Sequence, residues 1–322
     1  MLSVILAYVN EYPQVLFTIR SIAEELKGYD FEIITINNWC EEVKKTGFKE
    51  DKSHPSIMAA IEGNPWLVDL FYEKKLSHWQ AKNLGVRHSK GEFLWFPDAH
   101  VVPGKNSLST MYEFYKSNWE KLNGSLHLPL TYQILEWRKL IYGLRATPEK
   151  GHYFYEFEPL PPEGWKNGEK IFNPQNGIAV FETPVMSTCG CMIHRSIYDK
   201  LGGWPEEIGI YGGGEPFFNF SLAVLGMKKW IWNQGVLFHH GEKRGYSWNM
   251  DGWLRDELIA AYCYGGLELA TLKWSFVDGN LDVKNRIWHD VITNPTVNEH
   301  KSLIEANKKT NIKDWAQRWI LS

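Results

Sequence analysis

The N-terminal part of the chain alternates short apolar runs with amphipathic patterns. Residues 3–9 form a β-branched apolar run that predicts a strand, and apolar positions recur every three or four residues over 15–26, which predicts a helix. A second apolar run over 31–36 predicts another strand. Strand, helix and strand at this spacing indicate a βαβ unit and a parallel sheet, whose ligands bind at the carboxyl ends of the strands. We therefore expect Tyr8 and Asn37 to lie side by side at that rim.

The pattern continues to alternate through the middle of the chain and becomes mainly helical toward its end. It predicts a helix over 78–88, a strand over 92–96, a helix over 107–121, a strand over 188–194, a helix over 216–225 and a strand over 229–238. Residues 146–176, rich in Pro, Gly and aromatic side chains, predict a loop that lies across a cleft. The expected fold class is α/β, with a Rossmann-like, mostly parallel central sheet flanked by helices over 1–246 and a helical, Trp-rich extension over 247–322.

The composition mainly argues against certain classes of protein. The 322 residues carry a formal net charge of −3, which disfavours a dedicated DNA-binding protein because such proteins are usually basic. Four cysteines without a CxxC pair argue against a disulfide framework or a structural zinc site and fit a reducing compartment. Because no apolar run is long enough for a membrane span, we expect a cytoplasmic protein. Sixteen Trp and 15 Tyr suit the flat faces of sugars and nucleobases.

The strongest candidate for chemistry is the segment FPDAHVVP at 96–103, directly after a predicted strand. Asp98 and His100 are two residues apart in extended backbone, so both side chains point to the same side and can share a divalent cation. An imidazole in the ligand set shifts the preference from Mg²⁺ toward Mn²⁺. His239 or His240, at the end of another predicted strand, is the expected third ligand. Such a cation would stabilise the charge on a departing diphosphate.

The chain resembles the GT-A glycosyltransferases, most closely the catalytic domain of the polypeptide N-acetylgalactosaminyltransferases, and also family 2-like glycosyltransferases. Five segments carry the resemblance in order: SVILAYVNEYPQVLFTIRSI, EIITINN, SKGEFLWFPDAHVVP, TPVMSTCGCMIHRSIYDKLGGWPEEIGIYGGGEP and LFHHGEKRGY. The resemblance implies a GT-A fold and transfer of a hexosyl or N-acetylhexosaminyl group from a nucleotide-sugar donor, UDP-linked, to a hydroxyl acceptor, with Mn²⁺ or Mg²⁺ bound. A glycan, a protein and a modified DNA base are all compatible acceptors, and the helical extension would pack on the acceptor side.

The resemblance also implies a role for each matching residue. The nucleotide donor would be held by Tyr8, Asn10, Glu11, Asn37, Lys82, Arg244 and Tyr246, and the metal by Asp98, His100 and either His239 or His240. The sugar or acceptor would be bound by Tyr211, Gly213, Gly214 and Glu215, where glycines let the backbone approach closely. The catalytic residues implied are Glu215 and Asp98.

Departures from the family pattern leave alternatives open. Asn37 and Asn38 stand where the family usually has two Asp, which leaves room for a base other than uracil. Pro216 follows Glu215 where inverting relatives have a second acid, which favours retention of anomeric configuration, although Glu215 itself can serve as a base. The rival functions are a catalytically inactive carbohydrate-binding relative and a nucleotidyltransferase. The second is disfavoured because Tyr-Val-Asn-Glu-Tyr-Pro, rather than a Gly-rich basic loop, follows the first strand.

Overall fold

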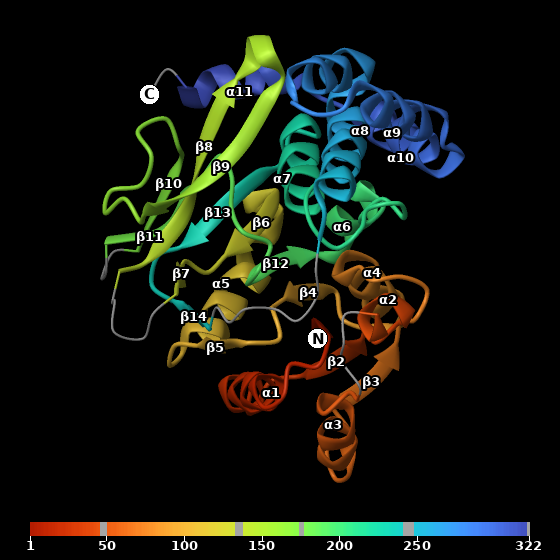
Figure 1. Ribbon diagram of the computed structural model, residues 1–322. Coiled ribbons are helices and arrows are strands. Elements are labelled where there is room, and N and C mark those ends of the chain that lie inside the picture. The colour runs from red at the N-terminus through yellow and green to blue at the C-terminus, as the bar shows by residue number, and fades with distance from the viewer. Residues whose placement is uncertain (46–49, 133–137, 174–176, 241–247, 321–322) are drawn as a thin grey trace.

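A nine-stranded sheet forms the centre of the molecule (Figure 1). The structure is a computed structural model and describes residues 1–45, 50–132, 138–173, 177–240 and 248–320. The strands of this sheet are β1 (Leu2–Tyr8), β2 (Phe31–Asn37), β3 (Leu67–Phe71), β4 (Phe93–Phe96), β6 (Gly124–His127), β10 (Lys170–Asn173), β11 (Gly177–Glu182), β12 (Cys191–His194) and β13 (Lys228–Trp232). They lie in the order β10-β11-β13-β6-β12-β4-β1-β2-β3.

The sheet is parallel in its N-terminal half and mixed elsewhere. Strands β4, β1, β2 and β3 run parallel, and Tyr8 pairs with Asn37 as the βαβ pattern predicts. Strand β12 runs antiparallel to both β4 and β6, so the sheet is less parallel than expected. Between β6 and β12 the chain passes through a second sheet and returns without a helical crossover, which a parallel neighbour would require.

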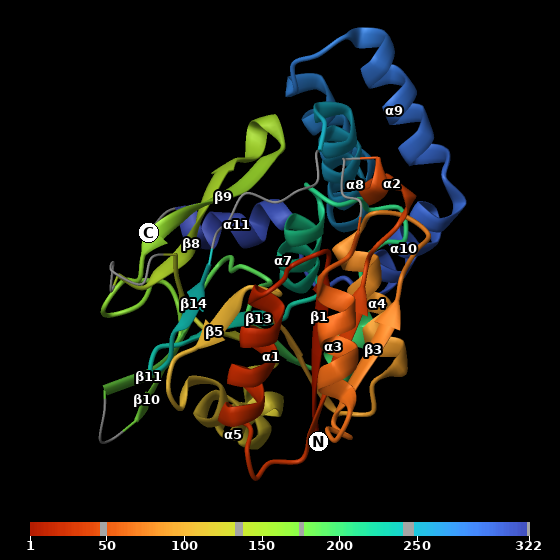
Figure 2. The same cartoon turned by 60° about the horizontal axis from the view of Figure 1, so that its bottom comes forward.

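Helices cover both faces of the central sheet (Figure 2). Alternate residues of β1 point to opposite faces, so Val4 packs with one hydrophobic cluster and Ile5 with the other. The helices on the Val4 face are α1 (Gln14–Glu25), α3 (Ser53–Ile61) and α5 (Ser107–Leu122). Those on the Ile5 face are α4 (His78–His88), α6 (Arg195–Leu201) and α7 (Gly214–Val224). The short helix α2 (Glu41–Lys44) follows β2.

A smaller five-stranded sheet includes the first part of the stretch 146–176 that was expected to be a loop. Its strands, in spatial order, are β5 (Val101–Pro103), β14 (Leu237–His239), β7 (Leu130–Thr131), β8 (Leu140–Thr147) and β9 (His152–Pro159). Strands β8 and β9 form a long hairpin around a short 3₁₀ turn, and β10 follows, so the loop prediction was wrong over 146–159 and 170–173, whereas residues 160–169 do form a loop. Pro148 and Gly151 mark only the turn, whereas Tyr153, Tyr155 and Phe157 repeat with the two-residue period of a strand.

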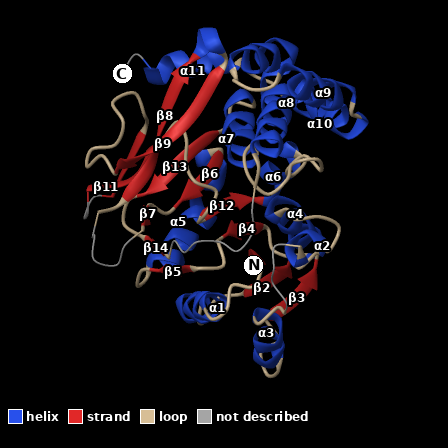
Figure 3. Cartoon of the chain, in the orientation of Figure 1, coloured by secondary structure: helices blue, strands red, loops and turns tan. Residues whose placement is uncertain are grey.

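The C-terminal part is helical, as expected. It consists of α8 (Met250–Phe276), α9 (Leu281–Thr293), α10 (Pro295–Asn307) and α11 (Ile312–Ile320). Helices α8, α9 and α10 gather beside α6 and α7, whereas α11 lies against α7 and β8 (Figure 3). One continuous apolar core runs from Ile5 in the sheet to Ile304 in α10. The boundary expected at residue 246 lies outside the described residues and stays a prediction. In the described part of the chain, no helix combines the length and the apolar character needed to cross a membrane.

Candidate active site

A cavity of about 680 Å³ opens at the carboxyl ends of β1 and β4, between the β8–β9 hairpin and the N-terminal halves of α7 and α8. The expected site residues that line it are Tyr8, Glu11, Lys82, Asp98, His100, Tyr211, Glu215 and His239. Among the described residues, those expected in the site that do not line it are Asn10, Asn37, Gly213, Gly214 and His240. Arg244 and Tyr246 lie outside the described residues.

Three of the expected metal ligands converge in this cavity. The Nε2 atom of His239 lies 3.3 Å from an Asp98 carboxylate oxygen, and the rings of His100 and His239 meet edge to face with centroids 4.7 Å apart. Both imidazoles are buried, with 8% of each residue exposed. His240 is exposed, and its backbone amide donates to the His100 carbonyl at 2.9 Å. The geometry therefore favours His239 over His240 as the third ligand.

Secondary structure holds these ligands in place. Asp98 and His100 lie on the short turn between β4 and β5, and β5 pairs antiparallel with β14 so that Val101 is opposite His239. The hydroxyl of Thr18, buried on α1, donates to the Ala99 carbonyl and accepts from the Val101 amide, each at 3.0 Å. The turn is thus fixed from both sides, and Asp98 and His239, 141 positions apart in the sequence, meet.

The electrostatics of the site keep Asp98 ionised. Burial alone would raise the pKa of this carboxyl, but the Lys82 ammonium, the His239 hydrogen bond and the His100 ring together hold it well below its ordinary value. The Lys82 nitrogen lies 3.5 Å from Asp98 and the side chain is almost fully buried beneath the cavity. An ionised carboxylate at neutral pH is the state that a divalent cation requires.

The donor set fits a divalent cation such as Mn²⁺. Glu11 accepts a hydrogen bond from Nδ1 of His100 at 3.1 Å, which fixes the tautomer whose Nε2 carries the lone pair, the arrangement usual for metal-binding imidazoles. Nδ1 of His239 is buried and has no hydrogen-bond partner among the described residues. Buried polar atoms usually have such a partner, so this ring nitrogen is unsatisfied by the described part of the protein. One carboxylate and two imidazoles give the site one hard oxygen ligand and two nitrogen ligands of intermediate hardness, a combination that suits Mn²⁺.

The structure adds Cys189, which the sequence analysis did not select. A ligand atom of Cys189 lies with those of Asp98 and His239 in a group whose members are all within 4.8 Å of one another. Burial raises the pKa of the Cys189 thiol well above its ordinary value, and the Asp98 charge adds to this. Metal binding by cysteine requires the thiolate, so a cation bound here would have to displace the thiol proton. Cys189 is therefore a further candidate ligand beside Asp98 and His239.

We expect Lys82→Met to weaken donor binding. The ammonium lines the cavity beside Asp98. The sequence resemblance implies that it contacts the donor diphosphate, and loss of such a charged hydrogen bond would cost about 1.5–3 kcal/mol. The apparent KM for the nucleotide sugar should rise by roughly 10- to 100-fold, by the conversion of 1.4 kcal/mol per factor of ten. Initial rates of nucleotide release against donor concentration measure this. Lys121→Met, an exposed lysine on α5, is the matched control, and an unchanged KM in Lys82→Met would count against the assignment.

Glu215 occupies the first turn of α7 with both carboxylate oxygens engaged. One oxygen accepts from the Ser187 hydroxyl at 3.1 Å, the Thr188 amide at 3.0 Å and the Thr188 hydroxyl at 3.3 Å. The other accepts from the Tyr155 hydroxyl at 2.6 Å. Burial, together with the Glu215 charge, raises the pKa of Tyr155 well above its ordinary value, so the phenol keeps its proton and remains a donor. The carboxylate is held in one orientation facing the cavity.

An aromatic wall, defined as Tyr132, Tyr142, Tyr155 and Phe157, joins the metal ligands to Glu215. Successive ring centroids along it are 4.6 Å apart from His239 to Tyr132, 4.9 Å to Phe157, 4.8 Å to Tyr142 and 4.4 Å to Tyr155. Tyr142 lies on β8, Tyr155 and Phe157 lie on β9, and Tyr132 directly follows β7; only the two residues on β9 fall in the stretch expected to be a loop. The rings of the wall close one side of the cavity against water and offer flat faces to a sugar.

Of the residues expected at the nucleotide base, Tyr8 lines the cavity, whereas Asn10 and Asn37 do not. The Asn37 amide nitrogen donates to Asp51 at 2.6 Å and its oxygen accepts from the Trp39 amide at 2.9 Å, so both polar atoms of the side chain have a partner inside the protein. The Tyr8 hydroxyl donates to Asp69 at 3.0 Å. The side-chain oxygen of Asn10 accepts from the Lys52 amide. These contacts build the floor beneath the end of β1, and direct contact of Asn37 with a base stays a prediction.

The glycines before α7 are required by packing. A Cβ on Gly213 would lie 2.0 Å from the Asp256 carbonyl oxygen, and a Cβ on Gly214 would lie 2.2 Å from the Trp79 ring. Side chains there would separate α7 from α8 and α4. Gly212, with φ of +102°, does line the cavity. The close approach of sugar to Gly213 and Gly214 therefore stays a prediction, whereas their contact with neighbouring helices is observed.

Comparison with known proteins identifies the fold. No protein-family model matches the chain. One curated relative, N-acetylgalactosaminyltransferase 6 of Drosophila melanogaster, is 25% identical over 146 residues, which are 45% of this chain and 20% of that protein. The crystal structure of GalNAc-T7 with UDP, GalNAc and Mn²⁺ superposes with a TM-score of 0.72 at 14% identity, covering 98% of this chain and 56% of that one. The chain thus spans a fifth of the curated relative and about half of GalNAc-T7.

A second solved structure shows the same architecture at lower similarity. The mannosyltransferase PcManGT from Pyrobaculum calidifontis, in complex with GDP-Man and Mn²⁺, has a TM-score of 0.50 and 14% identity over 95% of this chain and 73% of that one. These likenesses establish the fold: the chain has the GT-A fold of nucleotide-sugar glycosyltransferases. The fold class expected from the sequence is confirmed, and the cavity lies at the carboxyl edge where ligands of such sheets bind.

Proposed function

We propose that this protein is a metal-dependent glycosyltransferase that moves a sugar from a nucleoside diphosphate sugar to a hydroxyl acceptor. The observation that carries the proposal is the convergence of Asp98, His100 and His239 at the mouth of one cavity in a GT-A fold. The solved structures with this fold are bound to UDP with Mn²⁺ and to GDP-Man with Mn²⁺, which supports the same donor class and metal here. By the resemblance in sequence, we propose a UDP-linked donor.

In the proposed mechanism the chain's own residues orient both substrates. Asp98, His100 and His239 would hold Mn²⁺, which when bound neutralises charge on the departing diphosphate. Lys82, buried next to Asp98, adds a fixed positive charge on the same side. The acceptor oxygen bonds to the anomeric carbon as the bond from that carbon to the diphosphate oxygen breaks. The diphosphate leaves with the electron pair, and the hydroxyl proton passes to it.

We further propose that the anomeric configuration is retained. An inverting enzyme needs a carboxylate that removes the acceptor proton. Each carboxylate described in the cavity already has partners, as follows: Glu11 with His100, Asp98 with Lys82 and His239, Glu215 with its four donors, and Glu257 with Lys273. Glu215 is therefore proposed to orient the sugar or the acceptor. The configuration of the product at its anomeric carbon, read by NMR, tests retention directly.

The experiment that tests the function is a thermal-shift screen of UDP- and GDP-sugars with and without Mn²⁺. A donor present at 100 times its dissociation constant should stabilise the folded protein by about 2.7 kcal/mol. We expect a UDP-sugar to raise the Tm only when Mn²⁺ is present. Failure of every donor to shift the Tm would contradict the proposal and favour a carbohydrate-binding protein without donor chemistry. We also propose a cytoplasmic location, which four buried free cysteines support.

A further inference from the structure

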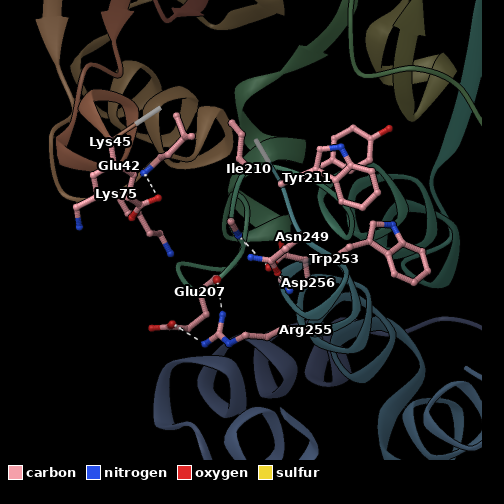
Figure 4. A pocket seen from close by; sticks show the side chains of 14 residues that line it. Glu42, Lys45, Lys75, Glu207, Ile210, Tyr211, Asn249, Trp253, Arg255 and Asp256 are labelled. Carbon is pink, nitrogen blue, oxygen red and sulfur yellow. Dashed lines mark hydrogen bonds and ion pairs between the residues drawn. The ribbon is translucent and has the colours of Figure 1, made fainter. Parts of the chain in front are cut away.

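A second cavity of about 580 Å³ lies next to the main one and is not used by the proposed mechanism. One side is formed by α2 and the segment before α4, which contribute Glu42, Lys45 and Lys75. The opposite side is the first part of α8, with Trp253 and Asp256 (Figure 4). Its volume falls in the range of about 300–1,000 Å³ that small-molecule sites occupy.

The two cavities share a wall that a ligand can cross. Ile210, Tyr211, Trp248 and Trp253 line both of them. The rings of Tyr211 and Trp248 stack on each other with centroids 4.9 Å apart and planes 23° from parallel. Both residues remain about half exposed, at 47% and 49%. A flat aromatic pair at the junction of two cavities provides a platform for a ligand that occupies both, and pyranose rings stack well on such faces.

The polar lining of the second cavity is balanced in charge. Three acidic side chains, Glu42, Glu207 and Asp256, face three basic ones, Lys45, Lys75 and Arg255. The Arg255 guanidinium is already bound by Glu207 at 3.0 Å and by Asp290 at 2.8 Å, and the Lys75 ammonium donates to the Glu206 carbonyl. A nucleic-acid backbone would require an excess of positive charge, which this lining does not offer. The chemistry favours an uncharged, polar ligand.

Asp256 is the most distinctive polar group of this cavity. Its Oδ1 accepts from the Gly209 amide at 3.0 Å, and within the described residues no hydrogen bond is made by Oδ2. Burial raises the pKa of this carboxyl to about 7. A largely buried carboxyl with one oxygen left for a ligand is suited to pairing with hydroxyl groups, which donate and accept at the same atom.

We propose that the second cavity binds the distal sugar units of an uncharged oligosaccharide acceptor, whose terminal hydroxyl enters the main cavity across Tyr211 and Trp248. The inference rests on the proposed glycosyltransferase function and names its acceptor class. Of the three acceptor types compatible with the sequence, the glycan is the one whose chemistry matches an aromatic platform combined with a charge-balanced pocket. A peptide or a DNA base would use the main cavity without these contacts.

The test compares acceptors that differ by one sugar unit. Matched pairs of methyl monosaccharides and the corresponding methyl disaccharides, built from hexose and N-acetylhexosamine units, are assayed with the best donor and Mn²⁺, beside a Ser/Thr peptide and a duplex containing 5-hydroxymethylated bases. We expect at least one disaccharide to have a KM roughly tenfold below its monosaccharide, the effect of about one charged hydrogen bond. Asp256→Asn and Glu42→Gln should each remove most of that advantage, and Glu41→Gln, an exposed neighbour on α2, should not.

Hydrolysis of the donor in the absence of an acceptor distinguishes failure of the proposed acceptor subsite from failure of the proposed glycosyltransferase function. Asp256 and Glu42 line only the second cavity, so their variants should release nucleotide from the donor at the wild-type rate. If wild-type protein hydrolyses the donor but no pair shows a disaccharide advantage, or the peptide or duplex is the preferred acceptor, the inference is overturned while the proposed function stands. If both variants keep the full advantage, the cavity is not the subsite. Absence of any Mn²⁺-dependent hydrolysis would contradict the proposed function itself.

Discussion

Asp98→Asn is expected to abolish Mn²⁺-dependent release of nucleotide from a UDP-sugar. The substitution keeps the size of the side chain but removes its negative charge. Neighbouring groups lower the pKa of Asp98 and so keep this charge on the wild-type side chain. Loss of even an outer partner of a metal ligand costs about 10- to 100-fold in affinity or activity, so loss of a ligand should lower kcat/KM by more than about a hundredfold. Nucleotide release is measured by a coupled assay over a range of Mn²⁺ concentrations.

The control for this prediction is Asp199→Asn, an exposed carboxylate on α6 that should leave nucleotide release unchanged. Thermal unfolding distinguishes a chemical effect from a folding defect. Asp98→Asn removes a partner from the buried Lys82, so a lower Tm is expected in the absence of ligands. The specific prediction is that Mn²⁺ and donor no longer raise the Tm of Asp98→Asn. Near-normal nucleotide release by Asp98→Asn would rule out the metal assignment.

Glu215→Gln is expected to lower kcat strongly while donor binding persists. The amide keeps an oxygen for the hydrogen bonds from Ser187 and Thr188, but its NH₂ group faces the Tyr155 hydroxyl and the negative charge is lost. Removing a fixed electrostatic group that acts in the transition state costs about 100- to 1,000-fold in kcat. Transfer rates at saturating donor, together with the donor-induced shift in Tm, measure the two effects separately.

Tyr155→Phe provides the graded comparison for Glu215. It removes one of four hydrogen bonds to the carboxylate and keeps its charge, so a much smaller decrease in kcat is expected, near the 0.5–1.5 kcal/mol of about one neutral hydrogen bond. Equal losses in Glu215→Gln and Tyr155→Phe would show that orientation alone is important. A Glu215→Gln enzyme with wild-type kcat would remove this residue from the mechanism.

The central part of the site was predictable because strand ends converge. Asp98 and His100 directly follow β4 of the central sheet, at the carboxyl edge where such sheets bind ligands. His239 ends a strand too, as expected, but that strand is β14 of the smaller sheet, and its pairing with β5 brings His239 to the other two residues. The choice between His239 and His240 could not be made from the pattern. The predicted single strand over 229–238 is in fact β13 and β14, separated by a turn containing Gly235, and the direction of each imidazole depends on that break.

Two other features depended on distant contacts that no local pattern reveals. Contact of Asn37 with a base stays a prediction, and the sequence did not reveal that Asp51, in the stretch after β2 for which it predicted no elements, accepts a hydrogen bond from this side chain. The half of the aromatic wall on β9 was missed because the Pro and Gly content of 146–176 suggested a loop, and no element was predicted for the stretch that holds Tyr132 and Tyr142. The alternation of Tyr153, Tyr155 and Phe157 was the signal that would have revealed a strand.

The most direct test of the account is Mn²⁺ binding by two variants at neighbouring positions. His239→Ala and His240→Ala remove the same side chain from adjacent residues, one buried against Asp98 and the other exposed. Mn²⁺ binding is followed by electron paramagnetic resonance of the free ion, in the presence of UDP. The account predicts that His240→Ala binds Mn²⁺ as tightly as the wild-type protein, whereas His239→Ala binds at least about tenfold more weakly. Equal binding by wild type and His239→Ala would contradict the convergence of these ligands on one cation.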